Sequence, residues 1–235
     1  MELLKEKWTK NDFKYFDMFL ESLAKKDKIS FTKNIVRTEM NVLAIPIPTL
    51  REIGKEICKG NYISFLDNIV FSYYESTIVF GAVVCNIKDF EILKKYIYVL
   101  CAVADNWASC DTLSFKINNK NAQNFYSLAL ELVKDSRTFA RRIGLIILFK
   151  LVNQEDYLNK IFEIITSLKN ESEYYVNMAV AWLLQVCFVK YRDKTLAFLW
   201  QKTTNDFVIR RTVSKCRDSF RVSSEDKKLL LELLK

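Results

Sequence analysis

Apolar residues recur at helical spacing along almost the whole chain. In the segment 121–133, Phe125, Leu128 and Leu132 stand at positions i, i+3 and i+7, which places them on one face of a helix. Segments 163–168, 207–216 and 229–234 repeat this spacing. The pattern predicts helices at residues 10–26, 30–38, 48–59, 61–71, 74–86, 89–103, 105–117, 121–134, 137–152, 155–168, 173–190, 193–201, 205–219 and 224–234.

Turn-forming residues are scarce, with 4 glycines and 2 prolines among 235 residues. A sheet needs such residues at every hairpin, so the chain is expected to be all-α. Pro46 and Pro48 stand just before a predicted helix, where proline is tolerated. Because no Ser-, Gly- or Pro-rich linker interrupts the pattern, residues 1–235 are expected to form a single domain.

A short motif opens three of the predicted helices. It reads Ser-Tyr-Tyr-Glu at 72–75, Ser-Arg-Thr-Phe at 136–139 and Ser-Glu-Tyr-Tyr at 172–175. The starts are 64 and then 36 residues apart, close to two units and one unit of a repeated helical pair. We therefore expect a HEAT-like helical-repeat solenoid, an α-α superhelix with a concave groove that suits a large partner.

The amino-acid composition excludes several kinds of catalytic and metal site. The chain has no histidine, which excludes Ser-His-Asp and Cys-His nucleophiles and any zinc site that uses imidazole. Its 6 cysteines form no Cys-x-x-Cys pair and lie in apolar stretches, as reduced core cysteines do. The first residues lack a signal-peptide pattern, and the longest uncharged apolar run, 96–104, is too short to span a bilayer. A cytoplasmic protein without membrane association is expected.

Positive charge is concentrated in the second half of the chain. The net charge is +8, and residues 136–235 carry 18 basic against 11 acidic side chains, a balance of +7. Clustering of this kind suits a polyanion such as nucleic acid. A soluble protein from a lysine-rich proteome is the alternative that charge alone leaves open.

The segment 104–111 carries the most unusual chemistry. Trp107 and Asp111 are four residues apart and share a helix face, with Asp105 as the expected N-cap and Asn106 as the alternative. A tryptophan face and a carboxylate together can hold a cationic group. A core tryptophan, with an aspartate that stabilises the first helical turn through the helix dipole, is the alternative.

Two further segments offer candidate side chains. Arg137, Arg141 and Arg142 precede a long apolar run, and an arginine there can reach phosphate or pair with a carboxylate such as Asp111. Farther along, Trp182 follows Met178 on one helix face, where ordinary core packing is the alternative.

Taken in order, Asn-Trp-x-x-x-Asp, Arg-Arg at a helix start and Tyr-Tyr-x-x-x-Ala-x-Ala-Trp resemble the AlkD-like DNA alkylation-repair glycosylases. The resemblance runs from about Val36 to Ser219 and includes the segment 43–51. It implies a HEAT-like solenoid that removes N3- and N7-alkylated purines. By this resemblance the catalytic group is Asp111, Trp107, Trp182 and Arg142, and the DNA-binding residues include Arg51. With the charge pattern, the expected DNA contacts are Arg51, Arg141, Arg210, Arg211, Lys215 and Arg217.

The implied mechanism needs no histidine, metal or cofactor. An alkylated purine is a cationic leaving group, and one carboxylate stabilises the oxocarbenium-like sugar between two indole faces. The resemblance further implies that the lesion is read without flipping the base. The expected partner is double-stranded DNA carrying alkylated bases, and the chain is expected to be monomeric.

Some positions depart from the pattern of active relatives. Gln185 and Met178 stand where those enzymes have basic residues, and Pro46 and Ile47 replace polar DNA contacts. Each lost cation removes a phosphate contact. A non-catalytic HEAT-like solenoid that binds nucleic acid or protein is therefore the alternative function.

Overall fold

The computed structural model describes residues 1–235 and is all-α, with fourteen α-helices and three short 3-10 turns. The sole β-type pairing is an isolated bridge between Asn41 and Tyr73. By their internal contacts the residues divide into two compact units, Met1–Lys116 and Ile117–Lys235. No helix combines the length and the apolar character that crossing a membrane requires.

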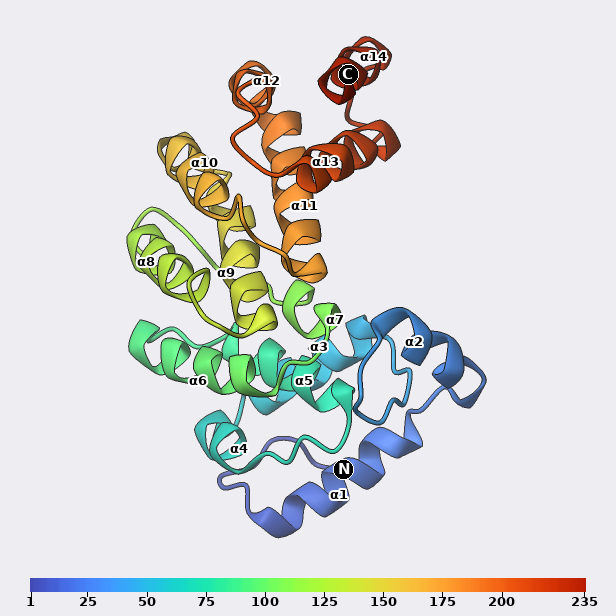
Figure 1. Ribbon diagram of the computed structural model, residues 1–235. Helices are drawn as coiled ribbons and strands as arrows, with labels where there is room; N and C mark the ends of the chain where they lie inside the picture. Colours follow the sequence, from blue (N-terminus) through green and yellow to red (C-terminus); the bar gives the residue numbers. More distant parts are fainter. The chain divides into compact units, whose positions relative to one another are not determined.

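An almost fully buried helix, α5 (Tyr74–Val84), forms the centre of the N-terminal unit. The unit contains α1 (Lys10–Ser22), α2 (Ile29–Val36), α3 (Ile47–Ile57), α4 (Tyr62–Asn68), α5 (Tyr74–Val84), α6 (Phe90–Val103) and α7 (Trp107–Asp111). Every residue of α5 except Ala82 is buried, and α3, α4, α6 and α7 all pack against it (Figure 1). A Cβ added at Gly54 of α3 would lie 2.7 Å from the Ala82 Cβ, so glycine permits this close approach of α3 to α5.

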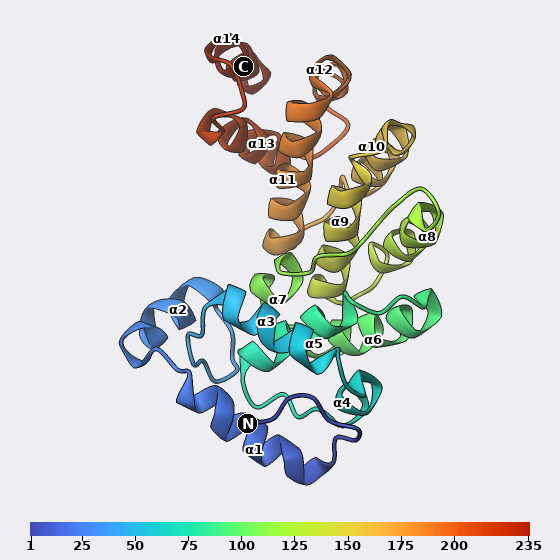
Figure 2. The same ribbon diagram turned by 180° about the vertical axis from the view of Figure 1, so that it is seen from behind.

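Helical pairs build the C-terminal unit. It contains α8 (Ala122–Leu132), α9 (Thr138–Leu151), α10 (Leu158–Ser167), α11 (Tyr174–Lys190), α12 (Arg192–Trp200), α13 (Asp206–Asp218) and α14 (Ser224–Leu231). α9, α11 and α13 pack in succession, while α8, α10 and α12 form a second row beside them, as both views show (Figures 1 and 2). This two-row stacking of helical pairs is the arrangement of a HEAT-like repeat, and it confirms the predicted fold class.

All fourteen predicted helices are present. The largest difference is α7, which ends at Asp111 although the pattern predicted a helix over 105–117. After it, Leu113 and Phe115 are buried while Ser114 and Lys116 are exposed. That alternation is typical of extended chain, and helical periodicity over the flanking residues concealed it. The six cysteines are free thiols, and five of them are buried as expected.

Candidate nucleic-acid site

Helix α7 presents only its two ends to solvent. Trp107 begins the helix and Asp111 ends it, and both side chains are half-buried. The three residues between them, Ala108, Ser109 and Cys110, are buried. The helix therefore exposes one indole and one carboxylate, four residues apart on the same face. Trp107 is not a core tryptophan, in contrast to Trp8, whose exposed fraction is 0%.

Hydrogen bonds fix the start of α7. The Asn106 side chain accepts from Ser109 N at 3.0 Å, so Asn106 is the N-cap and the first-choice prediction of Asp105 was wrong. Asp105 instead accepts from Thr38 Oγ1 at 2.7 Å and from Glu39 N at 2.9 Å, which leaves the cap to its neighbour.

Two contacts orient α7 within its unit. The Ser109 hydroxyl lies 2.6 Å from the Thr77 hydroxyl of α5, and both are buried. The Trp107 indole N–H donates to the Ile35 carbonyl of α2 at 3.1 Å, which fixes the ring. Asp111 occupies the C-terminal end of α7, so it does not stabilise a first helical turn. A carboxylate there faces the unfavourable end of the helix dipole.

Arg51 contacts the chain at the C-terminal end of α7. Its guanidinium donates to the Thr112 carbonyl at 3.1 Å, directly after Asp111 in the chain. Beside it lies a cavity of about 200 Å³. The cavity lining is Arg51, Lys55, Ala82, Cys85, Asn86, Thr112, Ser114 and Lys116. Arg51 thus contacts the residue that follows Asp111, and the cavity beside it adds Lys55 and Lys116, which sequence reasoning did not select.

A buried carboxylate holds the segment that leads into α3. Glu75 of α5 accepts from Leu43 N at 3.0 Å and Ile45 N at 3.4 Å. Between them Ala44 adopts a φ of 58°, a left-handed conformation that the two hydrogen bonds support. Burial raises the Glu75 pKa to about 7. Sequence analysis missed this role, although an acid at the start of an apolar helix was a visible signal.

The two adjacent arginines of α9 have different surroundings. Arg142 is buried, with 6% of its surface exposed, and donates to the Tyr175 carbonyl of α11. Arg141 donates to Glu171 at 2.8 Å in an ion pair whose side chains are 13% and 8% exposed. Arg141 also donates to the carbonyls of Asp135 and Ser136. These bonds order the start of α9, and DNA contact by either arginine stays a prediction.

Trp182 lies on the half-open face of α11. Its ring is half-buried and packs against Phe149 at a centroid distance of 4.4 Å. Met178 and Gln185 are half-buried on the same face, one turn to either side. Packing against Phe149 accounts for one side of the indole only, so Trp182 is not a fully enclosed core residue.

Sequence analysis also missed an aromatic strip at the N-terminal ends of α9, α11 and α13. Phe139 packs on Tyr175 at 5.4 Å, Tyr175 on Tyr174 at 5.3 Å, and Tyr174 on Phe207 at 6.0 Å between ring centroids. The Arg211 guanidinium lies 5.3 Å from the Phe207 ring centroid, a cation–π contact. The motif at 136–139 and 172–175 was the signal, because its aromatic residues recur once per helical pair.

The basic residues of α13 occupy two sides of that helix. Arg211 and Lys215 are one turn apart, next to the aromatic strip. Arg210 and Arg217 line separate cavities beside the C-terminal residues of the chain. Of the acidic residues near α13, Asp226 accepts from Arg192 at 2.8 Å. The roles of the basic residues as DNA contacts remain predictions.

The stacked helical pairs, with their basic and aromatic side chains, define a helical-repeat protein, a class that uses its extended surface to bind large partners. Residues 18–215 of the chain match the model of the DNA alkylation repair enzyme family. The chain belongs to that family, as the resemblance implied. No curated protein and no solved structure matches it significantly.

Proposed function

We propose that the protein is a DNA glycosylase that binds duplex DNA and excises N3- and N7-alkylated purines. Family membership supports a role in DNA alkylation repair. The finer assignment rests on one observation: α7 exposes a tryptophan and an aspartate and buries every residue between them. A helix kept only for packing has no need of a half-exposed indole and carboxylate on one face.

The proposed reaction breaks the bond between C1′ of the sugar and the alkylated purine nitrogen. The bonding electron pair leaves with the purine and neutralises its positive charge. Positive charge then develops on the sugar, where the Asp111 carboxylate stabilises it. A water oxygen forms the new bond to C1′ and releases its proton, so the products are a free alkylpurine and an abasic sugar. The base is removed without being flipped into a pocket.

The remaining residues support this step. The Trp107 ring, fixed by its bond to Ile35, offers a π-face to the electron-poor sugar. Trp182 supplies a second ring and Arg142 a positive charge, in the roles that the family resemblance implies. Arg51 and the cations of α13 contact backbone phosphates. The chain uses only its own side chains and water.

Product analysis tests this proposal. Wild-type protein incubated with methylated duplex DNA is expected to release free N7-methylguanine and to leave abasic sites, which alkali then cleaves. Unmethylated duplex is the substrate control. Binding of methylated DNA with no release of base would contradict the enzymatic assignment and favour a non-catalytic helical repeat.

A further inference from the structure

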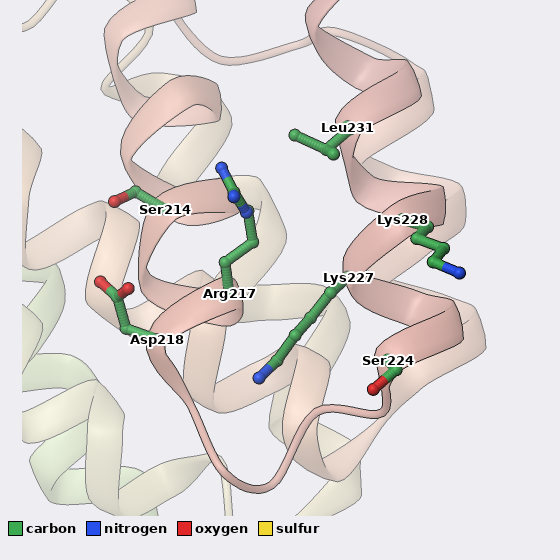
Figure 3. A pocket seen from close by; sticks show the side chains of 7 residues that line it. All are labelled: Ser214, Arg217, Asp218, Ser224, Lys227, Lys228 and Leu231. Carbon is green, nitrogen blue, oxygen red and sulfur yellow. The ribbon is translucent and has the colours of Figure 1, made fainter.

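A basic cavity lies between α13 and α14. Its volume is about 440 Å³. The lining consists of Ser214, Arg217, Asp218, Ser224, Lys227, Lys228 and Leu231 (Figure 3). Arg217 and Lys227 extend from the two helices into the space between them, whereas Lys228 points away from α13 (Figure 3). The two cations that extend into this space outnumber the one carboxylate of the lining, Asp218, so the cavity is positive.

The cations that line the cavity form no ion pair within the protein. Arg217, Lys227 and Lys228 take part in none of the ion pairs of the structure. The carboxylate nearest in sequence to the two lysines, Asp226, is bound by Arg192 at 2.8 Å, while its backbone N–H donates to Ser223, the N-cap of α14. Glu225 and Asp218, the other acids of this corner, are exposed. Two cations and two hydroxyls are donors suited to a phosphate group.

The connection between the two helices displays an aromatic ring. Phe220 is completely exposed, at 104% of its reference surface, and it is the most exposed large apolar residue of the chain. The turn is well formed: Arg221 N donates to Ser219 Oγ at 3.2 Å, and Val222, at 6% exposure, anchors it in the core. An ordered turn therefore holds a bare phenyl ring in water, where the ring gains nothing from burial.

We propose that the α13–α14 corner, defined as the cavity together with Phe220, binds an unpaired stretch of a DNA strand. A backbone phosphate occupies the cavity between Arg217 and Lys227, and Phe220 stacks on the neighbouring base. Cations beside an exposed ring are the features with which proteins hold single strands. Bases within an intact duplex offer no free face, so the ring selects strand that is locally open. This inference rests on the proposed action on DNA.

Fluorescence anisotropy with an undamaged single-stranded oligonucleotide tests the corner. Phe220→Ala is expected to weaken binding roughly 5- to 100-fold, the range for loss of one base–aromatic stack. Its salt dependence stays that of the wild type, because no charge is lost. Lys227→Ala is expected to make the slope of log K against log salt shallower by about 0.7, as for one phosphate contact.

Matched controls remove a ring or a charge elsewhere. Tyr15→Ala deletes an exposed ring of α1, 59% exposed, and Lys169→Ala deletes an exposed lysine before α11. Both are expected to bind like the wild type. Phe220→Trp should preserve affinity, and its added fluorescence should be quenched when a base stacks on it.

Wild-type affinity in Phe220→Ala would overturn the inference. A Phe220→Ala variant that keeps its single-strand affinity but no longer binds phosphatidylserine vesicles would also overturn it, because the corner would then be a lipid contact. If no alkylpurine is released while Phe220→Ala still weakens strand binding, the glycosylase proposal fails and the corner stands. If excision is normal while Phe220→Ala binds the strand like the wild type, the corner fails and the glycosylase proposal stands.

Discussion

At the scale of single residues, Glu75 links the stability of the fold to pH. Its pKa is raised from 4.5 to about 7 by burial, so the folded chain holds this proton more firmly than the unfolded chain. The stabilisation is complete below pH 4.5 and is lost as pH rises through about 7. The full difference is on the order of 3 kcal/mol, at about 1.4 kcal/mol for each unit of pKa.

Glu75→Gln keeps an acceptor for Leu43 N and cannot ionise. The free energy of unfolding of the wild type should therefore fall relative to this variant between pH 5 and pH 8. Urea unfolding of both chains across that range measures the difference, in which all other titrating groups cancel. A difference in the free energy of unfolding between the wild type and Glu75→Gln that is the same at every pH would contradict this role of Glu75.

Residue types and spacing selected Trp107, Asp111 and Trp182 as candidates, and in the structure all three are half-buried; their roles remain predictions. Local bonding was less predictable. The competition between Asp105 and Asn106 for the cap was decided by Thr38, which is 67 residues from Asp105 in the chain. The ion pair of Arg141 with Glu171 likewise depends on tertiary contact. A sequence pattern identifies neighbours on one helix and gives no such long-range partners.

At the scale of elements, α7 depends on its N-cap. Asn106→Ala removes the bond to Ser109 N, and we expect a loss of stability of about 1–2 kcal/mol. Because α7 carries both Trp107 and Asp111, excision should fall as well. Asn61→Ala is the matched control, since Asn61 caps α4 by the same bond to Ser64 N at 3.0 Å.

Thermal unfolding and release of N7-methylguanine distinguish the two cap variants. Both should melt at a lower temperature, but only Asn106→Ala should slow release at temperatures where the protein is folded. Equal rates of release in the two variants would show that the position of α7 does not matter for the reaction.

At the scale of the whole molecule, hydrophobic periodicity predicted the helices and the scarcity of turn residues predicted the fold class. The extended segment after α7 was missed, because the helical periodicity of the flanking residues concealed the short alternation of Leu113 and Phe115. The cavity between α13 and α14 was equally hidden, since it depends on how two helices pack. What the sequence showed there was only an excess of basic residues.

The central claim is that Asp111 acts on the reacting sugar, and Asp111→Asn tests it most directly. The variant keeps the size of the side chain and removes its charge, so N7-methylguanine release should fall on the order of 10²–10³-fold. Melting temperature should change little, and duplex binding should hold or tighten as a negative charge is lost. Glu91→Gln, which removes an exposed charge of α6, should release base at the wild-type rate. Release by Asp111→Asn at the wild-type rate would contradict the account.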